Sequence, residues 1–376
     1  MVYQGHNALK GLIIMVYSNF IDLIDLNDRP VSWWKKVIEL GAEIAGDPDK
    51  YSDACRGKIM ATLFYEPSTR TQMSFQTAML RLGGTIIGFD NPATSSVAKG
   101  ENLKDTTKIV SGYADIMVMR HPSEGSAKAA AISAECPIIN AGDGRHLHPT
   151  QTLTDLLTLY KEKGRLDGLT IGICGDLRNG RTAHSLCKAL AEFRGNSFVL
   201  ISTPTLRIPA YITDILSARG CPYKEVNTIE EAIGSLDMLY MTRIQRERFE
   251  SEEEYAAQKD IYCLDRRKMA MAGRDMIVLH PLPRVDEIAM DVDEDKRALY
   301  FKQAKYGMYV RMALIITMLS EKDNKTLLLS GRVHNGVKCT NPRCITNSEH
   351  YLPKSFRGTR DTLECEYCDE RVMLEF

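Results

Sequence analysis

Residues 64 to 75 read Phe64-Tyr-Glu-Pro-Ser-Thr-Arg-Thr-Gln-Met-Ser-Phe75, and the rest of the chain is arranged around them. An apolar run of strand length, 58–63, precedes this segment, and Gly83-Gly84 follows it. Five apolar side chains recur at helical spacing and predict a helix over 69–82. These residues are Met73, Phe75, Ala78, Met79 and Leu82. The first N–H groups of a helix lack partners, and the macrodipole makes that end positive. Three hydroxyls and Arg70 at this point predict an anion site, most naturally for phosphate. An ordinary Ser/Thr N-cap beside a surface arginine explains the same residues.

Strands and helices alternate on both sides of this segment. A first series of predicted strands covers 58–63, 85–89, 115–119 and 137–140, and a second covers 169–174, 197–201, 222–226, 236–241 and 276–279. Helical patterns lie between these strands, and this βαβ order predicts parallel sheets covered by helices. The fold class is therefore α/β, with two parallel-sheet domains joined by long helices at 150–163 and 300–321.

The predicted domains follow the chain in order. The first spans 1–149 and takes back the helix 300–321, the second spans 150–299, and a linker at 322–332 leads to a small β-rich region at 333–376. Residues 1–30 are weakly patterned, so we interpret them as an N-terminal extension.

Composition excludes several classes of protein. The chain has 376 residues, and its net charge of −1 argues against a general nucleic-acid or anionic-membrane binder. The longest apolar runs, 11–17 and 312–319, are too short to cross a bilayer, and no signal-peptide pattern is evident. Six of the ten cysteines are scattered, which is typical of reduced thiols. We therefore expect a cytoplasmic protein.

Unusual side chains gather where the predicted strands end. The clusters are Arg120-His121-Pro122, His148-Pro-Thr-Gln151, Asp176–Arg181, Thr242-Arg-Ile-Gln245 and His280-Pro-Leu-Pro-Arg284. Open α/β sheets bind ligands at the carboxyl ends of their strands, so five such clusters predict a cleft for several negative charges. Any one of them alone is explained by a surface arginine or a capping histidine. The polar loop 91–99, which contains Ser95 and Lys99, fits a solvated surface loop equally well.

The last four cysteines form two close pairs, Cys339-x4-Cys344 and Cys365-x2-Cys368. This spacing is typical of a structural zinc ribbon, and it favours a Zn2+ site over disulfides in a cytoplasmic chain. Four thiolates leave no open position on the metal, so the predicted role is folding and not catalysis. Residues 333–376 hold six Lys/Arg against seven Asp/Glu, which disfavours nucleic-acid binding.

These motifs together resemble a known family. Phe-Tyr-Glu-Pro-Ser-Thr-Arg-Thr, Met-Arg-His-Pro, His-Pro-Thr-Gln-Thr-Leu-Thr-Asp, Gly-Asp-Leu-Arg-Asn-Gly-Arg-Thr, Met-Thr-Arg-Ile-Gln and Leu-His-Pro-Leu-Pro-Arg are similar, in this order, to the catalytic chain of aspartate carbamoyltransferase. The match covers about 20–320. The tail from about 330 resembles the zinc domain of that enzyme's regulatory chain, without room for its nucleotide-binding domain.

The resemblance implies transfer of a carbamoyl group from carbamoyl phosphate to L-aspartate, a step of pyrimidine biosynthesis. The residues that it implies for the phosphate and the carbamoyl oxygen are Ser68, Thr69, Arg70, Thr71, Arg120 and His148. The resemblance further implies that Gln151, Leu282 and Pro283 bind the carbamoyl nitrogen. It implies that aspartate is bound by Arg181, Arg243 and Gln245. Ser95 and Lys99 match residues supplied by a neighbouring subunit, which implies a homotrimer or a higher homo-oligomer.

Two other readings remain. Ornithine carbamoyltransferase shares the phosphate motif, but that family usually has Cys where this chain has Pro281, and an acidic loop for the ornithine amine. A non-catalytic zinc-ribbon regulatory protein is the second alternative, and the intact Arg70, Arg120 and His148 speak against it.

Overall fold

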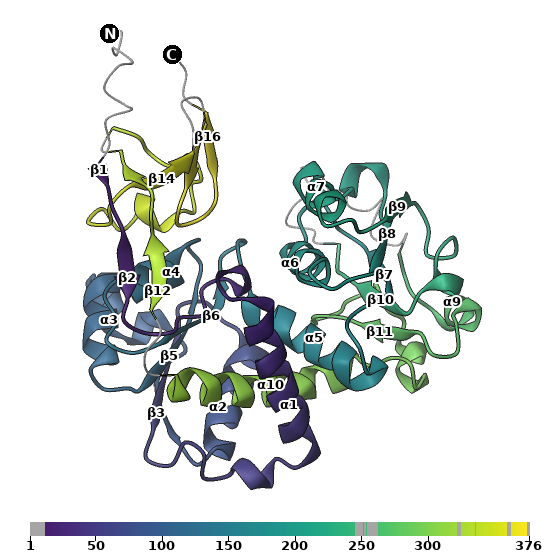
Figure 1. The fold of residues 1–376 in the computed structure, drawn as a ribbon, viewed down its shortest axis with the longest axis horizontal. Coiled ribbons are helices and arrows are strands. Elements are labelled where there is room, and N and C mark those ends of the chain that lie inside the picture. The colour runs from purple at the N-terminus through teal and green to yellow at the C-terminus, as the bar shows by residue number, and fades with distance from the viewer. Residues whose placement is uncertain are drawn as a thin grey trace. The chain divides into compact units, whose positions relative to one another are not determined.

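The computed structural model describes residues 12–244, 251, 253, 262–321, 325–334, 336–358 and 362–373. They form two compact units (Figure 1). The first contains the described parts of 1–30, 43–149 and 311–376, and the second those of 31–42 and 150–310. The predicted α/β fold with a small β-rich tail is confirmed.

The first unit is built on a four-stranded parallel sheet. Its order is β4 (Thr85–Phe89), β3 (Ile59–Phe64), β5 (Ile116–His121) and β6 (Ile138–Asp143). Because β3 lies inside the sheet, all its residues but the first are buried, which explains its continuous apolar sequence. The carboxyl ends of β3, β5 and β6 therefore share one edge.

Helix α2 (Thr69–Arg81) follows β3 and turns one face to the core. Thr71, Phe75, Ala78 and Met79 are its buried residues, at the spacing of a single helix face. Met73, predicted on that face, is 62% exposed. That part of the prediction is wrong because position 73 lies two residues from both 71 and 75, on the opposite side of the helix.

The second unit contains a five-stranded parallel sheet. Its order is β11 (Ile277–Leu279), β10 (Met238–Met241), β7 (Thr170–Cys174), β8 (Ser197–Ile201) and β9 (Tyr223–Val226). The helices α5 (Pro149–Lys163), α6 (Arg181–Leu190), α7 (Ala210–Ala218) and α9 (Arg266–Met271) accompany it in sequence. Strands β11, β10 and β7 are neighbours, so the loops that follow them also share an edge.

The tail forms an antiparallel sheet that includes the start of the chain. Its order is β1 (Leu12–Ile13), β13 (Arg332–Val333), β14 (Ser355–Gly358), β15 (Thr362–Cys365) and β16 (Arg371–Met373), so β1 forms one edge of the sheet beside β13 and β16 forms the other (Figure 1). Strand β2 (Val16–Ser18) likewise pairs with β12 (Thr326–Leu329). Residues 12–13 and 16–18 of the predicted extension are thus paired strands, and their partners, which lie about 300 residues away in sequence, include 326–329 of the predicted linker.

Within the described residues, the other α-helices are α1 (Val31–Gly46), α3 (Leu103–Ser111), α4 (Ser126–Ala131) and α10 (Tyr300–Ser320). From Arg311 onward α10 belongs to the first unit, where Arg311 Nη1 donates to Ser74 Oγ of α2 at 2.9 Å. Among the helices of the described residues, none is long and apolar enough to cross a membrane.

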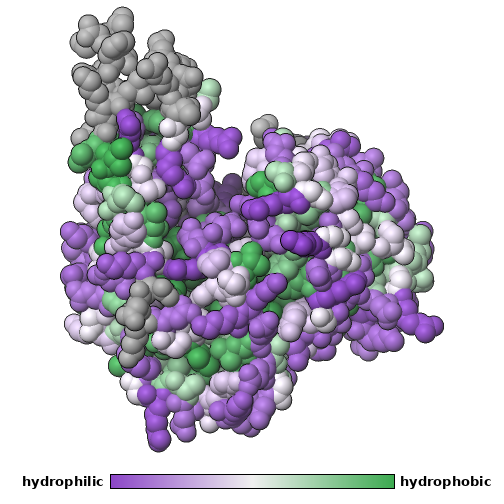
Figure 2. All heavy atoms as spheres, viewed as in Figure 1, coloured by the Kyte–Doolittle hydropathy of each residue, from purple (hydrophilic) through white to green (hydrophobic). Residues whose placement is uncertain are grey.

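Apolar side chains are exposed on and between the first two strands. Leu12, Ile13, Met15 and Tyr17 are between 49% and 75% exposed. Figure 2 shows green surface on this part of the first unit, next to the grey terminal residues.

Candidate active site

The segment 64–71 and Arg120 meet at the carboxyl edge of the first sheet. Phe64, the last residue of β3, is paired with Arg120 near the end of β5. The Tyr65 N–H donates to the Arg120 carbonyl at 2.8 Å. Parallel pairing therefore places the predicted phosphate loop directly beside Arg120.

The Arg120 guanidinium is held from two sides. Its Nη2 forms an ion pair with Glu66 Oε1 at 2.7 Å, and its Nη1 donates to the Ala141 carbonyl at 3.2 Å. It packs on Gly142, where a Cβ atom would lie 2.8 Å from Nη1 and where φ is +124°. Glycine is favoured here because a side chain would be strained at this φ and would displace the end of Arg120.

Arg70 adds a second positive charge at this place. Desolvation and the nearby charge of Arg120 both lower the pKa of Arg70. Ser68 occupies the N-cap position of α2, yet its side chain makes no capping hydrogen bond. The segment therefore differs from an ordinary side-chain N-cap, and its hydroxyl and guanidinium groups are of the types that bind anions.

His148 comes from the loop that follows β6. It is 9% exposed and directly precedes α5. The buried Asp143 carboxylate shapes this loop, since it accepts hydrogen bonds from the N–H groups of Leu147 at 2.9 Å and Gly125 at 2.8 Å. The loop thus returns to the edge that also carries Arg120.

His121, next to Arg120, has an environment that favours the neutral imidazole. Burial lowers its pKa to about 4, and its Nδ1 accepts from the Ser123 N–H at 2.9 Å. The folded pKa lies below the usual value of 6.5, so protonation favours unfolding.

We therefore expect the contribution of His121 to the free energy of unfolding to be complete above pH 6.5 and to be lost as the pH falls towards 4. The shift corresponds to about 3 kcal/mol at most. Urea midpoints at pH 7 and pH 4.5, compared between wild type and His121→Asn, measure it. Asn keeps an acceptor but does not titrate, and an equal loss in both proteins would contradict the assignment.

In the second unit, the residues predicted to bind the substrate aspartate follow β7 and β10. Arg181 is the first residue of α6, after a turn in which the Asn179 N–H donates to Asp176 Oδ1 at 3.0 Å. Arg243 follows β10 and is half-buried. Because β7 and β10 are neighbours, both arginines lie at the same sheet edge. Gln245 lies outside the described residues.

Gln151 and Leu282 are each oriented by a buried group. Gln151 Nε2 donates to Asp155 Oδ1 at 2.7 Å, which leaves the amide oxygen as an acceptor. The Leu282 N–H donates to His280 Nδ1 at 2.7 Å, and His280 Nε2 contacts Glu287 Oε1 at 2.7 Å. Pro283, which follows Leu282, is exposed.

Ser95 and Lys99 belong to the first unit, in a surface segment. Ser95 caps the short helix Ser96–Lys99 by accepting from the Val97 N–H. Lys99 is exposed, and within the described residues its ammonium group makes no ion pair. The structure thus groups Ser68–Thr71, Arg120 and His148 at one edge of the first unit, while Gln151, Arg181, Arg243, Leu282 and Pro283 belong to the second.

The predicted metal ligands come together. The Sγ atoms of Cys339, Cys344, Cys365 and Cys368 are buried and lie within 4.8 Å of one another. Two of the Sγ pairs are 3.6 and 3.7 Å apart, close to the value of about 3.8 Å expected for tetrahedral coordination with Zn–S bonds of about 2.3 Å. Four buried thiols with this spacing fit a closed metal site.

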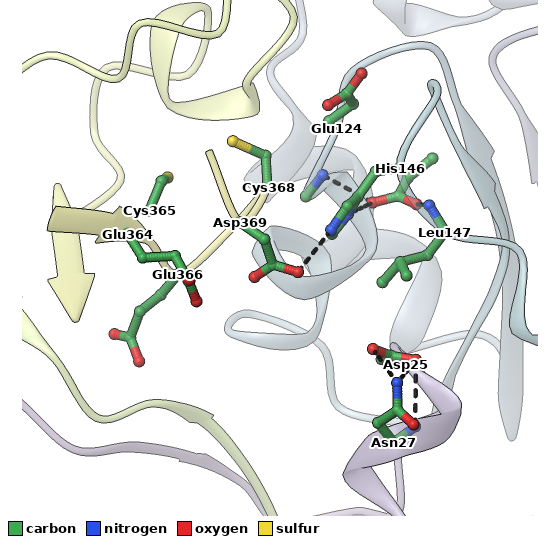
Figure 3. Close-up of polar contacts among 12 residues, drawn as sticks. Asp25, Asn27, Glu124, His146, Leu147, Glu364, Cys365, Glu366, Cys368 and Asp369 are labelled. Atoms are coloured by element: carbon green, nitrogen blue, oxygen red, sulfur yellow. Dashed lines mark hydrogen bonds and ion pairs between the residues drawn. The ribbon is translucent and has the colours of Figure 1, made fainter. Parts of the chain in front are cut away.

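Residues that the motifs did not single out connect this site to the first sheet. Nδ1 of His146 lies 3.1 Å from Asp143 Oδ2, and its Nε2 lies 2.9 Å from Asp369 Oδ2 (Figure 3). Burial opposes a charge on this ring, but the two carboxylates raise the pKa of His146 to about 10. Glu66, the partner of Arg120, was also missed, although it lies inside the opening motif.

Three regions of the chain match known families. Residues 21–161 match the carbamoyl-P binding domain of aspartate/ornithine carbamoyltransferase, and 167–318 match its Asp/Orn binding domain. Residues 331–375 match the metal binding domain of the aspartate carbamoyltransferase regulatory chain.

Relatives and solved structures agree. The chain is 57% identical to the aspartate carbamoyltransferase catalytic subunit of Clostridium novyi and 59% identical to that of Clostridium botulinum, in each case over 79% of this chain and 97% of the relative. The catalytic subunit of M. jannaschii aspartate transcarbamoylase is similar in structure, with a TM-score of 0.75, 45% identity and coverage of 79% and 97%. The Trypanosoma cruzi enzyme with carbamoyl phosphate and aspartate has a TM-score of 0.74 and 36% identity, with coverage of 80% and 95%.

Proposed function

The chain belongs to the aspartate/ornithine carbamoyltransferase family and is an aspartate carbamoyltransferase, and from this premise we propose how its residues divide the reaction. The first unit, within 1–149, binds carbamoyl phosphate, and the second, within 150–299, binds L-aspartate. The observation that supports this division is that β3, which leads into Arg70 and α2, pairs with β5, which carries Arg120, so both arginines belong to the first unit.

In the first unit, carbamoyl phosphate takes the place of the Glu66 carboxylate on Arg120. The phosphate lies at the start of α2, where Ser68, Thr69 and Thr71 offer hydroxyls and Arg70 a guanidinium. Arg120, His148 and Thr71 donate to the carbamoyl oxygen, where negative charge develops as the aspartate amine attacks. Fixed donors at that atom lower the barrier as an oxyanion hole does.

The reaction needs no covalent enzyme intermediate. The amine nitrogen forms a bond to the carbamoyl carbon, and the bond from that carbon to the phosphate oxygen breaks, so the phosphate leaves with the electron pair. The departing phosphate accepts the proton that the amine loses. The amide oxygen of Gln151, whose Nε2 donates to Asp155, and the carbonyls of Leu282 and Pro283 accept from the carbamoyl NH2 group.

Arg181 and Arg243, with Gln245, bind the carboxylates of aspartate. Arg243→Ala should raise the KM for aspartate and lower kcat, with phosphate affinity nearly unchanged, because the first unit holds the phosphate. Loss of one partner in a desolvated charged pair costs about 2–5 kcal/mol, which corresponds to roughly 30-fold or more in kcat/KM. Colorimetric measurement of carbamoyl aspartate, with phosphate titrated separately, tests it.

The matched control is Arg267→Ala, which removes an exposed arginine of the same unit that pairs with Glu230. It should leave the kinetics unchanged. If wild type carbamoylates ornithine faster than aspartate, or if Arg243→Ala weakens phosphate and not aspartate, the assignment of the second unit is wrong.

The protein is also proposed to act as a homotrimer or a higher homo-oligomer, to carry zinc and to reside in the cytoplasm. The exposed Lys99, with Ser95, then completes the site of a neighbouring chain. Zinc suits four thiolates better than magnesium or calcium, which prefer oxygen ligands. Scattered cysteines support the location.

A further inference from the structure

One side chain, His146, forms contacts that connect the loop carrying His148 to the C-terminal region around the four cysteines, which we call the ribbon (within 333–376). Its two ring nitrogens contact carboxylates of different parts of the chain, Asp143 at the end of β6 and Asp369 in the ribbon (Figure 3). Asp369 directly follows the metal ligand Cys368. His146 lies two residues before His148, so a contact made by the ribbon reaches the candidate active site through a very short piece of backbone.

The Asp143 carboxylate, one end of this bridge, organises the whole loop. Besides His146, its oxygens accept from the N–H groups of Leu147 and Gly125 and from Asn140 Nδ2 at 3.2 Å. It is 1% exposed, so these bonds form away from water, where they are strong. A movement of the His146 ring would therefore shift the Asp143 carboxylate, which also holds the backbone next to His148 through its hydrogen bond with Leu147.

A second contact connects the other pair of metal ligands to the same loop. Glu124 Oε1 accepts from the Arg145 N–H at 3.4 Å, and its Oε2 accepts from Asn341 Nδ2 at 2.6 Å. The Glu124 N–H also donates to the Arg343 carbonyl at 2.9 Å. Asn341 and Arg343 lie between Cys339 and Cys344, so both halves of the metal site contact the loop.

We propose that His146 is a positioning residue for the carbamoyl transfer, and that the metal-folded ribbon sets the geometry of His148 through His146, with Glu124 as a second anchor. This inference rests on the proposed role of His148. It assigns the tail a part in catalysis although none of the residues proposed to bind the substrates belongs to the tail.

The test combines kinetics with hydrogen exchange in the full-length chain. In His146→Ala we expect kcat to fall about tenfold, while the KM for aspartate and the affinity for carbamoyl phosphate change less than twofold and the metal content stays at one per chain. The amides of residues 144–147 should exchange faster.

His146→Gln, which keeps a donor towards Asp369, should recover part of kcat. Removing the metal with a chelator should speed the same amides in wild type and add little in His146→Ala.

Glu349→Ala is the control, because Glu349 joins the ribbon to the Leu103 N–H at 3.2 Å, away from the loop. It should leave kcat and the exchange of 144–147 unchanged. His148→Ala, measured in parallel, separates the two proposals. Full activity of His148→Ala would overturn the role given to His148. Loss of activity there, with wild-type kcat or wild-type loop exchange in His146→Ala, would overturn the positioning role.

Discussion

Refolding Lys99→Ala chains together with Arg120→Ala chains should restore about one active site in four, although each variant alone is nearly inactive. In the proposed trimer, each site takes Arg120 from one chain and Lys99 from its neighbour, and random mixing makes each half intact with a probability of about one half. Loss of a donor to a developing oxyanion costs about 10²- to 10³-fold in kcat, so the recovered activity stands far above the background. Carbamoyl aspartate production by the mixed and separate proteins measures it.

A second mixture serves as the control. Arg70 and Arg120 belong to the same edge of the same sheet, so every chain in a mixture of Arg70→Ala and Arg120→Ala lacks one of them. This mixture should stay inactive. Activity of the Lys99/Arg120 mixture that only equals the sum of its separate variants, with mixed trimers confirmed by mass, would place Lys99 in its own chain's site or outside any site.

Cys344→Ser or Cys365→Ser should remove the metal from the chain and unfold the ribbon. Metal binding contributes about 10–16 kcal/mol to the folding of small zinc-finger peptides, and the ribbon has only short strands of two to four residues to replace it. Elemental analysis should fall from one zinc per chain to none. Amides of β14 and β15 should lose their protection from exchange.

The control is Cys263→Ser, which changes a half-buried thiol outside the ribbon and should keep both the metal and the protection. Retention of the metal after loss of either ligand, or an intact ribbon without metal, would contradict the structural role. Because the ribbon pairs with β1 and contacts Glu124 and His146, the loss should extend to 144–147 and leave the second unit unaffected.

Much of the fold was predictable because its signals are local. The strands β3, β4, β7 and β8 are short apolar runs, and their predicted ranges agree with the structure to within a residue at either end. The four ribbon cysteines were also predictable, since the spacing of each pair reflects the geometry of a metal-binding turn. Met73 shows where this fails, because apolar character alone does not say which face of a helix meets the core.

The sequence by itself determined the class of fold, the family and the residue types gathered at the strand ends. These are properties of contiguous segments, and no knowledge of their neighbours is needed to recognise them. Only the tertiary structure decided that Glu66 is the partner of Arg120, that β1 pairs with β13, and that His146 contacts Asp369, 223 residues further along the chain. The physical reason is that a polar side chain or a two-residue strand could form its hydrogen bonds with many other segments of the same chain. Which one it meets depends on how the sheets bring distant segments together.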